Sequence, residues 1–501
     1  MSIQDELKAF NTQMGEVIDV HAAMSVLHWD QEVFMPPKGA GARGRQLATL
    51  AALSHRLFTA ESLGERLNYL NVNKKELTED QAIQVSESLY DYEQAQKLPE
   101  AFVEQFAQEQ SKAYEAWIQA RKDSDFKQFA PHLEILVDLL RQKAEYMGYD
   151  GSPYDALLSE YERGISTAEL KTIFSELAPR QRDLVAKIVA SEHQPDLAWV
   201  DKNWDEQVQW DLGVDVLRDM GYDFDAGRQD KSVHPFTTNF DQADVRVTTR
   251  IHPRELFSGL TGSIHEGGHA LYEQGFLECD RRTVLAEAIS LGIHESQSRM
   301  WENIIGRSQP FWNHYTPRFQ AAYGKQLDGI TPEQMYAAIN HVQPSFIRVE
   351  ADECTYNLHV ILRFELEVDL IEGRLDVKDV PEAWNAKVKD YLGLDVPDDA
   401  HGCLQDIHWS HGSMGYFPTY TLGNLYASQL FEQIEKDLPD IWSEVGAGQF
   451  APLLEWLRAR VHNVGRRKQA TVLIEDITGK APDSEAFMRY LNTKYGALYQ
   501  L

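Results

Sequence analysis

The sequence has very little cysteine and no long apolar run. Only three cysteines occur in 501 residues, and none forms a C-x-x-C pair. This excludes a disulfide framework and favours a reducing compartment. No run of 18 apolar residues is present, which argues against a membrane-spanning helix. The first residues, MSIQDELKAF, lack the basic and apolar segments of a secretory signal. We therefore expect a cytoplasmic protein.

Basic residues are also scarce relative to acidic ones. The chain has 78 acidic and 48 basic residues, which gives a formal net charge of -30. Such a charge repels phosphate backbones and anionic membrane surfaces. We expect neither nucleic acid nor a membrane as a partner. With 43% apolar residues, the chain can bury a large core as a globular protein.

Helical periodicity dominates what is present, with one exception that predicts a strand. Most of the first 220 residues place apolar side chains at helical spacing. Residues 243–251, ADVRVTTRI, instead alternate apolar and polar side chains, which predicts a half-buried strand. This strand could pair with a substrate backbone by edge addition. The helical pattern resumes near Glu255, and residues 401–418 read as a Gly- and His-rich loop.

The strongest chemical signal is H-E-x-x-H at His265, Glu266 and His269. Residues four apart on a helix lie about 40° apart, so both imidazoles can bind one zinc ion. Glu266 can then reach a water molecule at that ion. The alternative is a pair of core or surface histidines. A di-iron bundle needs two E-x-x-H motifs, and only His269 has Glu three residues before it, which excludes that reading.

A catalytic zinc needs a third protein ligand and one open position. A metzincin would have Gly at 272 and His at 275, but the chain has Tyr272 and Gly275. The pattern of residues 284–304 predicts one helix, which offers Glu287, His294, Glu295 and Glu302. Glu287 and Glu302 fit outer carboxylates that orient His265 or His269. Spacing alone does not single out Glu295.

Several segments together resemble the carboxypeptidase Taq family of metallocarboxypeptidases. HEGGH is followed by HESQ in GIHESQSRMWEN, and other family marks match in order: HPF at 234–236, D-x-R-x-T at 244–248, IRVEAD at 347–352 and GCLQDIHW at 402–409. The N-terminal LHWDQEVFMPP is similar too. The resemblance covers nearly the whole chain. It implies His265, His269 and Glu295 as metal ligands and Glu266 as catalytic base.

The family marks also indicate residues for the transition state. In the related thimet oligopeptidase-like zincins, a His and a Tyr twelve residues apart bind the transition state. His408 and Tyr420 have that spacing. Tyr416 is a possible substitute, and the alternative for either tyrosine is packing.

Three further residues are candidates for binding the substrate. Releasing one C-terminal residue requires a cation for the substrate carboxylate, and arginine binds carboxylates bidentately. Arg348 and Arg246 are the candidates, and His234 could shape the same wall. The alternatives are a salt bridge of Arg348 with Glu350 or Asp352, an exposed strand position for Arg246 and an ordinary loop histidine.

The resemblance implies a mainly α fold: one large helical zincin domain, thimet oligopeptidase- and neurolysin-like, with a deep substrate groove and a small β-sheet near the active site. Residues 1–220 would roof the groove, and residues 221–501 would form the catalytic part of the single domain 1–501. The expected function is a metallocarboxypeptidase of broad specificity, with one Zn²⁺ per chain, replaceable by Co²⁺, acting on peptides with a free C-terminus as a homodimer.

Two alternatives remain open at this point. The first is an oligopeptidase or dipeptidyl carboxypeptidase on the same scaffold. The second is a non-catalytic helical peptide-binding protein, which the presence of Glu266 argues against. Gly267 and Gly268 weaken the motif helix, since each costs about 1 kcal/mol relative to alanine. We expect them to admit a neighbouring backbone, either the strand or the groove wall.

Overall fold

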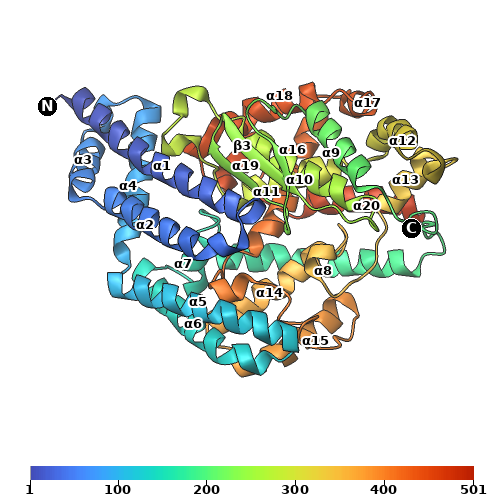
Figure 1. Cartoon of the computed structure of the whole chain (residues 1–501), viewed down its shortest axis with the longest axis horizontal. Coiled ribbons are helices and arrows are strands. Elements are labelled where there is room, and N and C mark those ends of the chain that lie inside the picture. The colour runs from blue at the N-terminus through green and yellow to red at the C-terminus, as the bar shows by residue number, and fades with distance from the viewer. Residues whose placement is uncertain (1) are drawn as a thin grey trace.

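The computed structural model describes residues 2–501 and shows a mainly helical molecule. Helices, most of them long, build the N-terminal part; the first seven lie to the left and below in Figure 1, and the eighth runs from the centre towards the right. They are α1 (Ile3–Val33), α2 (Ala40–Phe58), α3 (Glu61–Val72), α4 (Glu79–Lys97), α5 (Glu100–Asp123), α6 (Phe126–Met147), α7 (Pro153–Leu158) and α8 (Thr167–Ala190). The succession of helices predicted for the first 220 residues is therefore confirmed.

Helix α6 shows why these segments are helical. Its Leu133, Leu136 and Leu140 recur at helical spacing and are buried, so one face joins the core. The Asp125 side chain accepts a hydrogen bond from the Lys127 amide at the N-terminus, which satisfies a free donor. Gly148 ends the helix with a φ of 77°, a conformation that glycine adopts without strain.

One three-stranded sheet interrupts the helices. It consists of β1 (Gln229–Lys231), β2 (Thr237–Asp241) and β3 (Asp244–Thr249) in the order β1-β3-β2, with β3 antiparallel to β2 and parallel to β1. The predicted strand at 243–251 is thus confirmed with shorter bounds. Because β3 is central and paired on both sides, its proposed edge pairing with a substrate backbone is wrong.

The motif helix α10 (Ser258–Glu273) lies at the centre of the molecule. It packs against α9 (Glu206–Met220), the sheet and α11 (Leu291–Arg299), which packs in turn on α16 (Pro418–Asp437). The apolar side chains of Leu260, Ile264 and Leu271 are buried. This packing fixes α10 on nearly all sides, so the residues of the H-E-x-x-H motif project from a rigid element.

The prediction of one helix over 284–304 is wrong. A 3-10 turn at Val284–Ala286 is followed by extended backbone at Glu287, then α11, then a π-helix at Met300–Ile305. Ser290 caps α11 by accepting a hydrogen bond from the Ile293 amide. Serine is a preferred N-cap residue because its hydroxyl satisfies a free backbone donor, so the helix starts here rather than six residues earlier.

The remaining helices complete a single main core. They are α12 (Gln309–Tyr323), α13 (Pro332–Ile339), α14 (Tyr356–Ile371), α15 (Val380–Leu392), α17 (Ile441–Gly446), α18 (Ala451–Arg460), α19 (Ala470–Thr478) and α20 (Glu485–Tyr499). The loop predicted at 401–418 is confirmed apart from a 3-10 turn at His408–His411. The main buried cluster extends from Ala113 to Tyr499, and a smaller one lies among the N-terminal helices.

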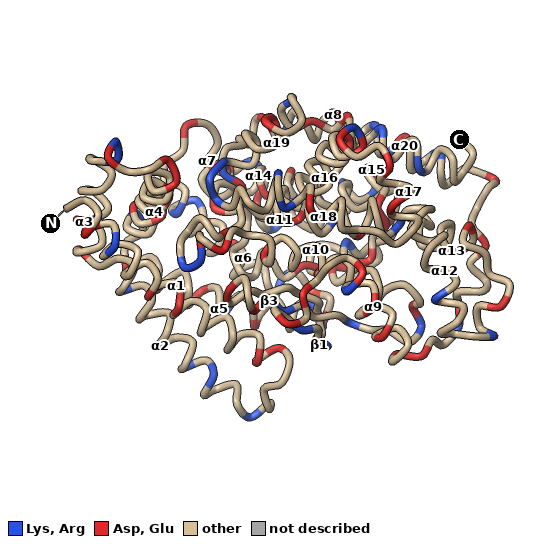
Figure 2. The backbone as a smooth tube through the Cα atoms, turned by 90° about the horizontal axis from the view of Figure 1, so that it is seen from above, with Lys and Arg blue, Asp and Glu red and all other residues tan. Residues whose placement is uncertain are grey.

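Charged residues are distributed over the whole backbone, with acidic and basic positions interspersed (Figure 2). Within residues 2–501, no helix combines the length and the hydropathy that crossing a membrane requires.

Candidate metal centre

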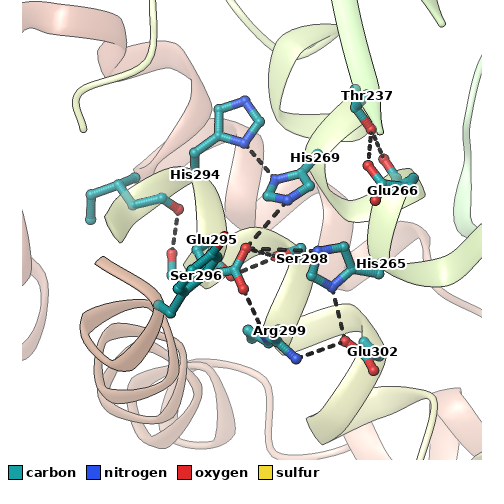
Figure 3. A network of polar contacts seen from close by, with 12 residues as sticks. Thr237, His265, Glu266, His269, His294, Glu295, Ser296, Ser298, Arg299 and Glu302 are labelled. Carbon is teal, nitrogen blue, oxygen red and sulfur yellow. Dashed lines mark hydrogen bonds and ion pairs between the residues drawn. The ribbon is translucent and has the colours of Figure 1, made fainter. Parts of the chain in front are cut away.

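Two imidazoles and one carboxylate converge between α10 and α11 (Figure 3). His265 and His269 lie one turn apart on α10, and Glu295 lies on α11; one donor atom of each lies within 4.8 Å of the others. Glu295 Oε2 is 3.7 Å from His265 Nε2 and 3.4 Å from His269 Nε2. Ligands bound tetrahedrally at about 2.1 Å lie about 3.4 Å apart. The donor set and its spacing therefore fit a zinc ion.

His265 is oriented by a carboxylate on its other ring nitrogen. Its Nδ1 lies 2.9 Å from Glu302 Oε2, an arrangement typical of metal-binding histidines. Arg299 and Arg307 bind the same carboxylate at 3.2 and 3.1 Å. Burial raises the pKa of Glu302, but these arginines and His265 outweigh it and hold the pKa far below its usual value. Glu302 therefore stays an anion.

Glu287, the other carboxylate predicted to orient a metal-binding histidine, binds an arginine instead. Its Oε2 accepts a hydrogen bond from Arg466 Nη1 at 2.9 Å. The residue lies on extended backbone before α11, so it does not share the helix face of Glu295. The prediction that Glu287 orients a metal-binding histidine is wrong.

His269 is contacted through its other ring nitrogen by a path of residues that was not predicted from the sequence to orient it. Its Nδ1 contacts Nδ1 of His294, whose Nε2 lies 2.7 Å from Glu273 Oε1. Asn239 of β2 donates a hydrogen bond to the other oxygen of Glu273. Burial lowers the pKa of His269 to about 3, so the ring is neutral. One sequence signal was available: Glu273 follows His269 by four residues, on the same helix face.

Glu266 is buried beside the proposed ligands, and within residues 2–501 no arginine forms an ion pair with it. Its side chain accepts a 2.7 Å hydrogen bond from Thr237 Oγ1 of β2. Burial raises the pKa of Glu266, opposed in part by His265 and by Thr237. A carboxylate with a raised pKa takes up a proton more readily, as a general base must.

The two glycines of the motif helix accommodate neighbouring helices. A Cβ on Gly268 would lie 2.7 Å from Gln297 O and Ser298 Cα, and one on Gly267 would lie 2.3 Å from Leu217 Cδ2 of α9. The backbone that approaches α10 is therefore α11, the helix that carries Glu295. The expectation that it would be the strand is wrong, and a position of this contact in the wall of a groove stays a prediction.

A second polar group comes from the 401–418 loop and α16. His408 Nε2 lies 3.3 Å from Tyr420 Oη, and the Tyr416 ring is 5.3 Å from both of their rings. Burial lowers the pKa of His408 to about 3. Burial also raises the pKa of Tyr416 and Tyr420, and the Glu295 carboxylate adds to both shifts. A neutral imidazole and two protonated phenols thus lie near the ligand set.

Arg348 is buried next to this group. Its Nε donates to Asp406 Oδ1 at 3.0 Å, its Nη1 donates to Tyr356 Oη at 3.0 Å, and its guanidinium lies 5.0 Å from the Tyr420 ring. Arg363 binds the other oxygen of Asp406 at 2.7 Å. Two cations therefore share one carboxylate.

The salt-bridge partner anticipated for Arg348 is different from the one observed. Neither Glu350 nor Asp352 pairs with it, because Asp406 takes that position. Asp352 instead accepts hydrogen bonds from the backbone amides of Cys354 and Thr355. The carboxylate thus caps the turn before α14 and does not neutralise Arg348.

Arg246 and His234 lie at the sheet. Arg246 forms a two-point ion pair with Asp244, both contacts being 2.8 Å, and its guanidinium lies 4.3 Å from the Trp29 ring centroid of α1. Its side chain is only 19% exposed, so it is not an open strand position. His234 is exposed between β1 and β2.

In the register of the sheet, Arg246 of β3 lies opposite Thr238 of β2. The Arg246 side chain therefore projects from the face of the sheet opposite to that of Thr237, which binds Glu266.

Comparison with known proteins finds relatives over nearly the full length of the chain. Residues 9–495 match the carboxypeptidase Taq (M32) metallopeptidase family. Thermostable carboxypeptidase 1 of Thermus thermophilus is 41% identical over 94% of each chain, and carboxypeptidase 1 of Bacillus subtilis is 38% identical over 100% of each.

Solved structures give the same result. The M32 carboxypeptidase from Deinococcus radiodurans has a TM-score of 0.97 at 38% identity and covers 99% of this chain and 100% of its own. Metallocarboxypeptidase 1 of Trypanosoma cruzi has a TM-score of 0.94 at 32% identity, with the same coverage. The fold is therefore the M32 carboxypeptidase fold, and the chain belongs to the carboxypeptidase Taq (M32) family of metallopeptidases.

Proposed function

We propose that this protein is a zinc-dependent carboxypeptidase that releases single C-terminal amino acids from peptides with broad specificity. The observation that carries the proposal is the convergence of His265, His269 and Glu295, with the buried carboxylate of Glu266 adjacent to the first ligand. Two imidazoles and one carboxylate are the donor set of a catalytic zinc site. We propose one zinc ion per chain, with cobalt as a functional substitute.

The residues around the ligands divide the chemistry among them. A zinc ion held by His265, His269 and Glu295 would act as a Lewis acid and would lower the pKa of a water molecule to about 7. Glu266 takes the proton from the attacking water and passes it to the leaving nitrogen. His408 and Tyr420 contribute hydrogen bonds to the oxyanion that develops on the scissile carbonyl, with Tyr416 able to replace Tyr420.

Arg348 is the better placed of the two arginines for the substrate carboxylate. Arg348 and Arg363 share the single carboxylate of Asp406. One positive charge of these two buried arginines is therefore not neutralised, which favours the binding of another anion. The positive charge of Arg246 is already neutralised by its ion pair with Asp244. We therefore assign the substrate carboxylate to Arg348 first and to Arg246 second, and let His234 shape the wall of the site.

The wider setting also forms part of the proposal. A deep groove roofed by residues 1–220, as in thimet oligopeptidase- and neurolysin-like zincins, would admit the peptide to the catalytic part at 221–501. The contacts of β2 with α1 and α10 support a position of the N-terminal helices over the catalytic part. Assembly as a homodimer and a cytoplasmic location stay predictions.

The identity of the first product tests the function directly. An N-blocked peptide of eight different residues is incubated with zinc-loaded protein, and products are identified at successive times. A carboxypeptidase releases the last amino acid first, then the next. Dipeptides or internal fragments would instead show a dipeptidyl carboxypeptidase or an oligopeptidase on the same scaffold. An intact peptide would favour the non-catalytic peptide-binding alternative.

A further inference from the structure

The two metal-binding histidines are supported in different ways. His265 Nδ1 contacts a carboxylate directly, that of Glu302. His269 Nδ1 instead contacts a second histidine, His294, and the other ring nitrogen of His294 contacts the carboxylate of Glu273. The path from His269 through His294 to Glu273 therefore has one more hydrogen bond than the direct contact of His265 with Glu302. It also joins α10 to α11, and Figure 3 shows the contact between His269 and His294.

Hydrogen-bond direction along this path follows from the role of His269. If Nε2 of His269 binds the metal, it needs its lone pair, so the proton of the neutral ring is on Nδ1. That N–H donates to Nδ1 of His294, which must therefore be unprotonated. His294 then carries its own proton on Nε2 and donates it to Glu273 Oε1, 2.7 Å away. Each ring nitrogen of His294 on this path therefore has one role: Nδ1 accepts a hydrogen bond and Nε2 donates one.

The far end of the path is anchored in the sheet. Glu273 is buried, with 7% of its surface exposed, and its second oxygen accepts a hydrogen bond from the Asn239 side chain of β2. Thr237, two residues earlier on the same strand face, holds Glu266. A single strand therefore fixes both the proposed base and the end of the histidine path.

We propose that His294 is a positioning residue for metal binding, which fixes the tautomer and ring orientation of His269 through the path Asn239, Glu273, His294. The proposal rests on the proposed metal site but not on the reaction. His294 also lies next to Glu295, the third proposed ligand. Its contact with His269 therefore ties the ligand on α11 to the pair on α10.

Zinc affinity of matched variants tests the proposal without any hydrolysis. His294→Leu removes both hydrogen bonds, whereas His294→Gln keeps one acceptor and one donor. His462→Leu is the control, because His462 is also buried and its Nε2 lies 3.0 Å from Gln297 Oε1 of α11, which is not a proposed ligand. Zinc dissociation constants are measured by competition with a chelating dye, after circular dichroism has shown that each variant is folded.

The expected loss of zinc affinity is about 10- to 100-fold for His294→Leu, with most of it recovered in His294→Gln and almost none in His462→Leu. Wild-type affinity in His294→Leu, or an equal loss in Leu and Gln variants, would overturn the proposal.

Imidazole ¹⁵N spectra of the zinc-loaded wild type supply a second readout that does not depend on folding of a variant. They should show His294 protonated on Nε2 and His269 on Nδ1. A proton on His294 Nδ1 would equally overturn the proposal. Failure of the carboxypeptidase assignment would appear only in the product analysis, so the two outcomes are distinguishable.

Discussion

Three buried glutamates near His265 and His269, the two proposed metal ligands, have different protonation behaviour because their neighbours differ. Burial raises the pKa of all three, yet Arg299 and His265 draw those of Glu295 and Glu302 well below the usual value. Glu266 has no arginine partner, and its pKa remains raised. Glu295, the proposed ligand, and Glu302 are thus kept as anions, while Glu266 can accept a proton.

The role of Glu266 predicts a separation of metal binding from hydrolysis. Glu266→Gln should bind zinc as the wild type does, because the residue is not among the three ligands. It should lose about 10²- to 10⁴-fold in hydrolysis rate, the usual contribution of a general base. Zinc content and the rate on one N-blocked peptide are measured together. Undiminished hydrolysis would remove Glu266 from the mechanism.

The two arginines can be compared through substrates with and without a free carboxylate. Arg348→Lys should lose about tenfold or more of kcat/KM for a free peptide, since hydrogen bonds to charged groups contribute roughly 1.5–3 kcal/mol. A C-terminally amidated peptide should be cleaved equally poorly by wild type and variant. Arg246→Lys is the matched comparison. A wild-type preference for the free acid in Arg348→Lys would transfer the assignment to Arg246.

Only part of this site is predictable from the sequence at the residue scale. The H-E-x-x-H pair is local, because helix geometry alone brings His265 and His269 together. Glu295 needed a family resemblance, since four residues between 284 and 304 had suitable chemistry. The contact of His294 with Glu273 depends on how α11 approaches α10, and no sequence spacing contains that information.

At the scale of elements, the close approach of α10 and α11 brings the three proposed ligands together. Gly268 permits it, because a side chain there would meet the backbone of Gln297 and Ser298. Gly268 therefore relates to the packing of α10 against α11, and Gly267 relates to the packing of α10 against α9.

Substitution of Gly268 tests that contact. Gly268→Ala should push α11 away from α10, destabilise the fold by about 1–3 kcal/mol and weaken zinc binding. The matched control is Gly496→Ala in α20, where a Cβ meets nothing within 4 Å. That control should be neutral or slightly stabilising. Unfolding midpoints and zinc dissociation constants are compared, and wild-type zinc affinity in Gly268→Ala would show that the helix spacing is not set here.

The start of α11 is held by a buried acid with a pH-dependent effect. Glu162 accepts hydrogen bonds from Ser290 Oγ and the Gly292 amide, at 3.0 and 2.8 Å, and from Tyr426 Oη at 3.1 Å. Burial raises its pKa from 4.5 to about 7. The folded protein thus keeps a proton that the unfolded chain releases, and this contribution to stability is lost as the pH rises from about 4.5 through 7.

Glu162→Gln should therefore change the pH dependence of stability. A shift of this size corresponds to roughly 3 kcal/mol, so relative to the variant the wild type should lose about that much stability between pH 5 and pH 8. Melting curves of both proteins at the two pH values measure the difference. An equal change in both proteins would mean that Glu162 does not titrate in this range.

Element predictions succeeded where a pattern was self-contained. The alternation in residues 243–251 gave the strand, because a pleated backbone alone produces it. The helix predicted over 284–304 failed, because Ser290 and the distant Glu162 offer the backbone amides of residues 292 and 293 better partners at a new N-terminus. Of these two, only the serine could have been read as a helix start.

At the scale of the whole molecule, the N-terminal and catalytic parts share one interior. The main core includes Leu133 and Leu217 on one side of the predicted boundary and Leu260 and Tyr495 on the other. The boundary at residue 220 therefore does not coincide with a break in the core. Composition indicated a large core, but its continuity arises from tertiary packing that a linear pattern does not encode.

The central claim is that one metal ion binds between α10 and α11, and anomalous diffraction at the zinc edge tests it over the entire molecule. Crystals of the zinc-loaded protein should show one strong peak per chain, within about 2.0–2.2 Å of a nitrogen of His265, a nitrogen of His269 and an oxygen of Glu295. A peak at other residues, or a fourth protein side chain that closes the coordination of this ion, would contradict the account.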